Sequence, residues 1–329
     1  VWATAVESFV GSAGVDTLVL SGSGAVALSA LETVLGSSAA DTVALLAGAR
    51  LALSAIDVLV GGTGQDTAVL LGVGSITVSA IDSFIGSAQV DTVTLSGPGQ
   101  FAFSAVETII GSAQVDTVVL QDSGAAGAVL TFAVSAVDTV IGTNAIEQLT
   151  LLNSGTTTIS AIDTVTGSTG TDVIRLLATD TLALSAIESV IGSEFAETIQ
   201  LLGSGTIAIS AISSAIGSAE LDTVALLSAQ SIAVSAFDFV VGSAGVDTVQ
   251  LQGSFAIGVS AIESVVGSGA TETLSLTGAL QIAVSSVDTV IGSAAAETVQ
   301  LLGVDSLSVS AIDTVLGSNA AETLQVLGA

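Results

Sequence analysis

The chain has 329 residues, half of them hydrophobic, and 30 acidic side chains stand against two arginines, which gives a formal net charge of −28. This balance excludes nucleic-acid binding, because neutralising phosphates requires Lys and Arg, and it disfavours anionic membrane surfaces. No membrane insertion is expected, because acids interrupt every apolar run well short of the ~20 residues that a spanning helix needs. The chain has no Cys and therefore no disulfide framework.

A unit of about 25 residues recurs thirteen times from the first residues onward. Its second copy includes SALETVLGSSAADTVAL over residues 29–45, and the only longer step is the one that separates Glu107 from Asp138. A fixed period of this size is typical of solenoids, in which each repeat contacts only its neighbours. We therefore predict one continuous solenoid over residues 1–329 rather than two domains, either as a segment of a longer solenoid or as one unit of a filament.

Three strand-like segments follow one another in each copy, and in the second copy they are residues 26–29, 31–35 and 42–45. The columns of Val43 and Leu45 are apolar, whereas the Ala44 column between them is mixed. This period of two indicates strands. Strands so short need neighbours, so we expect each to pair in parallel with its equivalent in the next copy. The predicted fold is all-β: a parallel β-helix (β-solenoid) of about 13 coils, with about 25 residues and roughly three strands per coil, of either hand.

Three further features of the repeat predict details of the structure. The Gly that ends the second segment is present in all copies, and we expect it at a corner where a side chain would need positive φ or would strike the next coil. The six extra residues near 121–130 read as a bulged corner that leaves the stack unbroken. The column that contains Leu46 and Leu71 either faces outward, as a possible lateral contact, or turns a corner inward.

Two acidic columns accompany the strands, nine residues apart. The first acids, interrupted once by Ser213, are Glu7, Glu32, Asp57, Asp82, Glu107, Asp138, Asp163, Glu188, Asp238, Glu263, Asp288 and Asp313. The second acids are Asp16, Asp41, Asp66, Asp91, Asp116, Glu147, Asp172, Glu197, Asp222, Asp247, Glu272, Glu297 and Glu322.

Stacking of equivalent residues would place like charges about 4.8 Å apart along both columns. Each neighbouring pair would cost about 0.9 kcal/mol in water, and two arginines cannot compensate. The acids must therefore be splayed into solvent, partly protonated, or bridged by cations. These alternatives remain open at the level of the sequence.

The stretch Gly61–Val69 fits the nonapeptide G-G-x-G-x-D-x-U-x, and the stretches that begin at Gly11, Gly167 and Gly242 come close. These corners resemble the RTX, or haemolysin-type, calcium-binding repeats of secreted bacterial proteins. The resemblance covers one corner in each copy, whereas that family has tandem nonapeptides. It implies Ca²⁺ as the cofactor, bound by turn carbonyls and by the second acids from Asp16 to Glu322; solvated carboxylates are the alternative.

No catalytic residue and no enzyme activity is predicted, because the acids repeat evenly and no Lys or His is present. We expect an extracellular or cell-surface bacterial structural protein that builds a filament, sheath, surface layer or adhesin stalk. Its partners are copies of itself, joined end to end because neither end has a polar cap, and in addition side by side; a cell-surface partner stays unknown. The alternatives are a calcium-responsive secreted binding module and, remotely, an ice-binding solenoid suggested by the Thr17 column.

Overall fold

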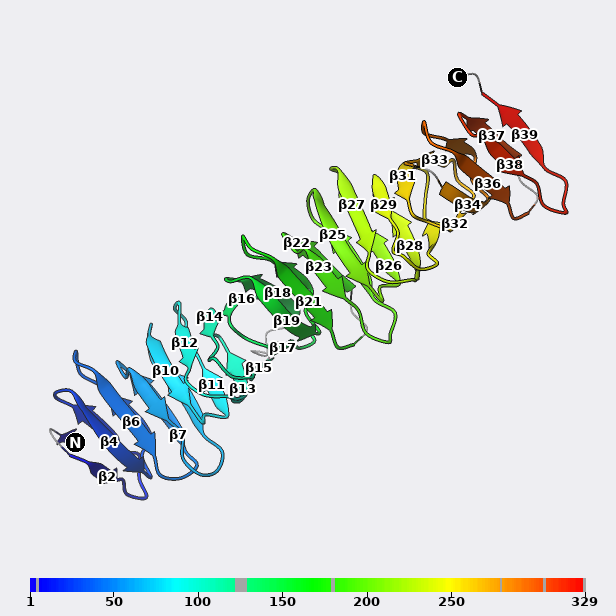
Figure 1. Cartoon of the computed structure of the whole chain (residues 1–329). Helices are drawn as coiled ribbons and strands as arrows, with labels where there is room; N and C mark the ends of the chain where they lie inside the picture. The colour runs from blue at the N-terminus through cyan, green and yellow to red at the C-terminus, as the bar shows by residue number, and fades with distance from the viewer. Residues whose placement is uncertain (4–5, 122–128, 179–180, 279, 304–305, 328–329) are drawn as a thin grey trace. The chain divides into compact units, whose positions relative to one another are not determined.

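The structure is a computed structural model that describes residues 1–3, 6–121, 129–178, 181–278, 280–303 and 306–327. All regular elements in this part of the chain are β-strands. The chain divides into two compact units, Val1–Gly170 and Thr171–Ala329, and each is a parallel β-solenoid of two sheets (Figure 1). Among the described residues, no helix has the length and apolar character needed to cross a lipid bilayer.

In the first unit, odd-numbered strands form one sheet and even-numbered strands the other. The odd-numbered strands are β1 (Trp2–Ala3), β3 (Thr17–Leu20), β5 (Thr33–Leu35), β7 (Arg50–Ser54), β9 (Thr67–Leu70), β11 (Ser83–Ile85), β13 (Gly99–Ser104), β15 (Asp116–Leu120), β17 (Thr139–Ile141) and β19 (Gly155–Ser160). The even-numbered strands are β2 (Ser8–Val10), β4 (Gly24–Ser29), β6 (Asp41–Leu45), β8 (Val58–Val60), β10 (Ser75–Ser79), β12 (Thr92–Leu95), β14 (Thr108–Ile110), β16 (Val129–Ser135), β18 (Ile146–Leu151) and β20 (Thr164–Thr166).

The second unit repeats the same two-sheet arrangement. Its odd-numbered strands are β21 (Asp172–Leu176), β23 (Ser189–Ile191), β25 (Gly205–Ser210), β27 (Asp222–Leu226), β29 (Phe239–Val241), β31 (Ala256–Ser260), β33 (Thr273–Leu276), β35 (Thr289–Ile291), β37 (Ser306–Ser310) and β39 (Thr323–Val326). Its even-numbered strands are β22 (Thr181–Ser185), β24 (Thr198–Leu201), β26 (Ser214–Ile216), β28 (Ser231–Ser235), β30 (Thr248–Leu251), β32 (Ser264–Val266), β34 (Leu280–Ser285), β36 (Glu297–Leu301) and β38 (Thr314–Leu316).

Three kinds of strand alternate along the chain. An a-strand follows the first acid, as β5 does. A b-strand begins at or beside the second acid, as β6 does at Asp41. A c-strand ends in the Ser of the Ser-Ala pair, as β4 does. Within each sheet, an a-strand is followed by a c-strand, a c-strand by a b-strand, and a b-strand by an a-strand. No strand pairs with its own kind in the pairings described.

The parallel β-solenoid is confirmed, but the predicted coil is wrong in its details. A coil, one full circuit of the chain, contains two strands rather than three, and the described part of the chain makes about 18 turns rather than 13. Equivalent residues of successive copies do not pair: Thr42 pairs with Val58 and not with Thr67, and Ser8 pairs with Ala27. One repeat therefore makes one and a half coils, so equivalent strands of successive copies lie in opposite sheets.

The core lies between the two sheets of each unit and consists of the inward residues of all three strand kinds. In the second copy, the b-strand buries Val43 and Leu45, the c-strand buries Val26 and Leu28, and the a-strand buries Val34. Each kind presents aliphatic side chains to the same narrow interior. This similarity allows any kind to stack on another, because burial of apolar area does not depend on which aliphatic residue supplies it.

The longer step of the repeat is accommodated within the first unit. Thr108 pairs with Ala133, whereas the corresponding pair one copy earlier, Ser83↔Ala102, is closer along the chain by the length of the insertion. The added residues therefore lie between strands that still pair in the regular order. Residues 122–128, which make up most of the predicted bulge, lie outside the described residues.

The Leu column faces outward, and its members are about half exposed. Each follows a b-strand, as Leu46 follows β6 and Leu71 follows β9. Because β6 and β9 belong to opposite sheets, the column does not form one stripe but alternates between the two sides of its unit. Its members are Leu46, Leu71 and Leu152 in the first unit and Leu177, Leu202, Leu227 and Leu302 in the second.

Candidate functional site

Turns of three kinds stack in a fixed order at each edge of a unit. The a–b turn carries the Gly-Ser stretch and the second acid, the c–a turn carries the Ser-Ala pair and the first acid, and the b–c turn carries no repeated acid. In the direction of the chain, the strand pairing places each a–b turn on a b–c turn and under a c–a turn. The candidate site is this stack of three turns.

The second acids are buried at the centre of the stack. All eleven from Asp41 to Glu297 are at most 1% exposed, and only Asp16 and Glu322, in the first and last copies, are partly exposed. The expectation that these carboxylates splay into solvent is therefore wrong for the eleven. The physical reason is that the turns around them need hydrogen-bond acceptors, because buried backbone N–H groups are rarely left unpaired.

The second acids first close their own a–b turns, in twelve of the thirteen copies by a bond of one kind. The N–H of the residue four positions earlier donates to the carboxylate, as Gly62 does to Asp66 Oδ2 at 2.7 Å and Ser87 does to Asp91 Oδ2 at 2.6 Å. The Ser hydroxyl of this turn adds a second donor in several copies, as in Ser87 Oγ to Asp91 Oδ2 at 2.9 Å. The carboxylate thus takes the place of a backbone carbonyl in a tight turn.

Several second acids also reach the b–c turn of the preceding coil. Asp66 Oδ1 accepts the N–H of Ala49 at 3.0 Å, and Asp91 Oδ1 accepts that of Gly74 at 3.0 Å. Asp222 makes the same contact with the N–H of Gly205 in the second unit. One carboxylate therefore ties two successive coils together.

The first acids complete the network from the following coil. From Glu32 onward, each accepts the backbone N–H of the second acid beneath it, as Asp57 Oδ2 does from Asp41 at 2.8 Å. The same contact joins Asp16 to Glu32, Asp66 to Asp82, Asp91 to Glu107, Asp116 to Asp138, Glu147 to Asp163, Asp172 to Glu188, Asp222 to Asp238, Asp247 to Glu263, Glu272 to Asp288 and Glu297 to Asp313. Carboxylates of both acidic columns thus accept hydrogen bonds from backbone N–H groups.

The single interruption of the first column removes this contact. Ser213 stands where the other copies have Asp or Glu, above Glu197. In the described structure the Glu197 N–H donates to no side chain, although the Glu197 carbonyl still accepts the N–H of Ser213 at 3.2 Å. A serine side chain is too short to span the distance that a carboxylate covers.

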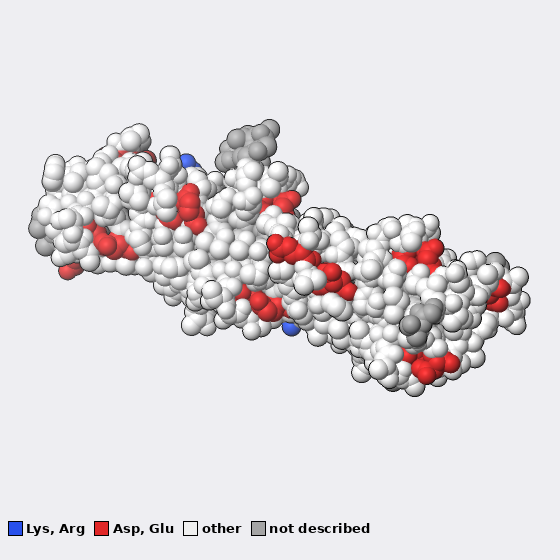
Figure 2. Space-filling model, turned by 90° about the horizontal axis from the view of Figure 1, so that it is seen from above, with Lys and Arg blue, Asp and Glu red and all other residues white. Residues whose placement is uncertain are grey.

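The prediction that equivalent acids stack directly on one another in columns is wrong. Successive second acids lie at opposite edges because a repeat makes one and a half coils, so one edge recurs only after three coils, or about 14 Å. That distance exceeds the screening length of about 8 Å at physiological ionic strength. Figure 2 shows the acids as separate groups on the visible face, with uncharged surface between them.

The surroundings move the pKa of three of these groups in different directions. Hydrogen bonds from the backbone and hydroxyl of Ser12 lower the pKa of Asp16, and bonds from the hydroxyl and backbone of Ser318 lower that of Glu322. Burial raises the pKa of Glu147, against the hydrogen bonds from Thr143. Charge is favoured where donors surround a carboxylate and disfavoured where the carboxylate is dry.

The donors around the second acids do not fit calcium as described. Ca²⁺ takes six to eight oxygens, whereas both oxygens of Asp66, in the stretch that best matches the nonapeptide, face N–H groups. Among the described residues, no three or more acids are grouped in a way that could hold a metal ion. Buried oxygens without a partner do occur, at Asp41, Asp116, Glu147, Glu197, Glu272 and Glu297. Calcium binding at Asp16 to Glu322 stays a prediction.

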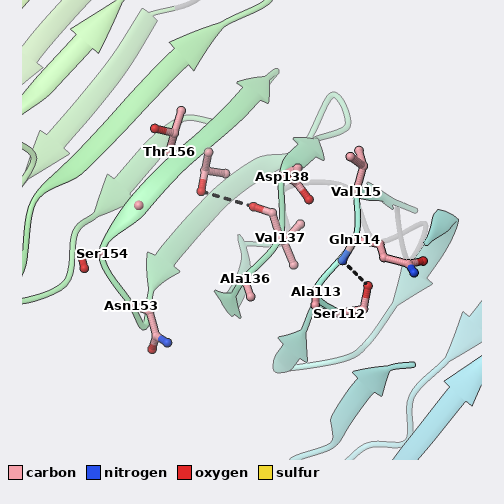
Figure 3. Close-up of a pocket in the computed structure, with 12 residues that line it drawn as sticks. Ser112, Ala113, Gln114, Val115, Ala136, Val137, Asp138, Asn153, Ser154 and Thr156 are labelled. Atoms are coloured by element: carbon pink, nitrogen blue, oxygen red, sulfur yellow. Dashed lines mark hydrogen bonds between the residues drawn. The ribbon is translucent and has the colours of Figure 1, made fainter. Parts of the chain in front are cut away.

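The grooves of the surface repeat with the turns. One of about 320 Å³ lies over three stacked turns, 112–115, 136–138 and 153–157 (Figure 3). Thr157 Oγ1 donates to the Val137 carbonyl at 3.4 Å across it, and Asp138 is its one charged residue. Other grooves contain the first acids Glu32, Glu107 and Glu188 in the same position. These grooves follow from the repeat and do not single out one site.

The alanines that shape the c–a turn were not among the residues predicted from the sequence. Ala55 and its equivalents hold φ between 52° and 57°, in the left-handed region. The regular recurrence of Ala after Ser was the feature of the sequence that could have indicated this turn. These alanines are Ala30, Ala55, Ala80, Ala105, Ala136, Ala161, Ala186, Ala211, Ala236, Ala261 and Ala311, with Ser286 in the remaining described copy.

Comparison with known proteins adds no family to this description: no protein-family model, curated protein or solved structure matches the chain.

Proposed function

We propose that the chain is a structural protein that works outside a bacterial cell, as part of a filament, sheath, surface layer or adhesin stalk. The observation that supports this proposal most is the evenness of the molecule. The same three-turn network and the same grooves recur along both units, and the carboxylates of the network accept backbone hydrogen bonds. A repeated surface suits assembly and spacing better than chemistry on one substrate.

Self-association is the activity that this proposal requires. The purified chain is expected to form assemblies whose mass rises with protein concentration, measured by sedimentation velocity and electron microscopy. The half-exposed Leu side chains after the b-strands offer apolar contacts along each unit. A chain that stays monomeric at high concentration, with and without calcium, would contradict the proposal.

The calcium-responsive module remains the second candidate, and the buried unpaired oxygens at Asp41 and Asp116 are the observation that favours it. Ice binding has less support. Thr17 lies in β3 and Thr42 in β6, which belong to opposite sheets, so the Thr column does not form one face. Thermal hysteresis in dilute solution would be the sign of ice binding, and none is expected.

A further inference from the structure

One outward position of the b-strands alternates in character between successive copies of the first unit. It is aliphatic where the b-strand lies in the odd-numbered sheet, and small or polar where the b-strand lies in the even-numbered sheet. In chain order the residues at this position are Val19, Ala44, Val69, Thr94, Val119 and Thr150. Because successive copies lie in opposite sheets, the alternation gives the two sheet faces of the first unit different surfaces.

The outward face of the odd-numbered sheet carries an unbroken apolar stripe. Val69 of β9 pairs with Ala52 of β7 on one side and with Ile85 of β11 on the other. The same trio recurs on the next three strands of the sheet. Each odd-numbered strand from β3 to β17 contributes one partly exposed residue, and we call this set the outer stripe: Val19, Leu35, Ala52, Val69, Ile85, Ala102, Val119 and Ile141.

The other sheet faces lack such a stripe. On the even-numbered sheet of the first unit the equivalent positions are interrupted by Thr77, Thr94, Thr150 and Thr166. In the second unit the outward b-strand position holds Arg175, Gln200, Ala225, Gln250, Ser275, Gln300 and Gln325. An unbroken stripe over eight strands is therefore a feature of one face of one unit and not a general consequence of the repeat.

The distribution of charge makes a sheet face the favourable side for contact between copies. Only three acids lie in the described strands of the first unit, Asp41, Asp116 and Glu147, and all three are buried. The one charged side chain that these strands expose is Arg50, at the beginning of β7. Two chains of net charge −28 repel least when they approach through such a face, and Arg50 beside the outer stripe offers a cation to acids in the turns of a partner.

We propose that the occupant of the outer stripe is the same face of a second copy of this chain, packed sheet on sheet. The proposal rests on the structural role proposed above and names the surface through which copies join side by side. Strands β3 to β19 of this sheet, about 4.8 Å apart and about 15 Å long, offer about 600 Å² per copy. A pair of such faces reaches about 1,200 Å², the lower limit for a stable interface.

The test makes one substitution at the same repeat position in two successive copies. Val69→Lys places a charge in the outer stripe, whereas Thr94→Lys places the same charge on the opposite face. Both lysines reduce the net negative charge equally, so a difference between the variants cannot come from net charge. Sedimentation velocity of the full chain should show association at least about tenfold weaker in Val69→Lys and within about twofold of wild type in Thr94→Lys.

The folding of both variants is checked by thermal melting. The Val69 and Thr94 side chains point outward and are partly exposed in the single chain. Both variants should therefore melt within about 5 °C of wild type.

Thiol labelling gives a second readout that does not depend on an added charge. The chain has no cysteine, so Val69→Cys and Thr94→Cys each introduce a single reporter. Reaction of the Val69→Cys variant with a maleimide should slow at least about tenfold when the protein is concentrated enough to assemble. The Thr94→Cys variant should react at the same rate in dilute and concentrated protein.

The outcomes separate this contact from the structural role itself. If wild type assembles but Val69→Lys assembles equally well, or if Thr94→Lys is weakened as much as Val69→Lys, the outer stripe is overturned as the contact, while a structural role through another surface stands. If wild type does not assemble at all, both proposals are overturned.

Discussion

Some second acids accept N–H groups from two coils and others only from their own turn, so their length and protonation state decide how well each coil is joined to the next. Asp66 accepts N–H groups with both oxygens, from Gly62 and Ala49. Glu147 accepts with Oε1 from Thr143, while its Oε2 is buried without a partner. The same column therefore contains carboxylates that accept hydrogen bonds with both oxygens and carboxylates that accept with only one.

These two positions should respond oppositely to an amide. Asp66→Asn turns an acceptor into an NH₂ group that faces an N–H, so it should lower the free energy of unfolding by about 2 kcal/mol. Glu147→Gln keeps the acceptor for Thr143 and removes a buried charge, so at neutral pH it should be neutral or stabilising by up to about 1 kcal/mol. Urea unfolding of both variants at pH 7 measures the contrast; equal losses in both would contradict this account.

The difference between Glu147→Gln and wild type should depend on pH. Because burial raises the pKa of Glu147 in the folded chain, the folded state binds a proton that the unfolded state has already lost, and the contribution of Glu147 to stability falls as pH rises through that window. The advantage of the Gln variant should therefore shrink toward acidic pH. Asp16 and Glu322 act in the opposite sense: their lowered pKa values give stability that is lost as pH falls.

Ser213 offers a gain of stability at one residue. Ser213→Asp should restore the acceptor for the Glu197 N–H that the other described copies have, and raise the free energy of unfolding by about 1 kcal/mol. Amide hydrogen exchange at Glu197 should slow in the same variant. Ser214→Asp adds the same charge on the outward side of β26 and serves as the control; an equal effect in both variants would show that charge, and not the hydrogen bond, is responsible.

At the scale of the elements, adjacent turns are locked by the close approach of a Gly and an Ala. The Gly36 N–H donates to the Ser54 carbonyl at 2.8 Å, and a Cβ on Gly36 would lie 1.8 Å from the carbonyl oxygen of Ala55. The left-handed conformation of Ala55 turns that carbonyl toward the preceding coil. Two reasons were expected for the Gly at this position. The clash of a side chain with the next coil applies at Gly36, whereas the positive φ is found at Ala55 instead.

Gly36→Ala should therefore disrupt the stack locally. A backbone carbonyl cannot move away without breaking the strand pairing around it, so the loss should be at least about 3 kcal/mol. Gly22→Ala, in a b–c turn with no atom within 4 Å of the added Cβ, is the control and should change stability by less than about 0.5 kcal/mol. Circular dichroism on denaturation compares the two; a tolerated Gly36→Ala would mean that the turns are less tightly packed than described.

At the scale of the whole molecule, the question is whether the acid network needs a metal. A calcium ion at 100 times its dissociation constant adds about 2.7 kcal/mol per site, and thirteen second acids would multiply that effect. Because the described carboxylates already accept N–H groups, we expect the intact chain to melt at the same temperature in Ca²⁺ and in chelator. A large rise with Ca²⁺ would contradict this donor assignment and favour the calcium-responsive module.

The sequence by itself determined the strands, the inward aliphatic columns of residues such as Val43 and Leu45, and the crowding at Gly36, because alternation and the repeat report directly on which side chains face a core. Only the tertiary structure decided that two strands make a coil and that a c-strand, not its equivalent, lies next to an a-strand. Because the three strand kinds bury similar side chains, the apolar pattern does not predict the order in which they stack. The acids follow from that order: the same spacing that suggested facing charges in Asp41 and Asp66 places them at opposite edges. Each accepts a backbone N–H of its own turn, and Asp66 also accepts one from the preceding coil.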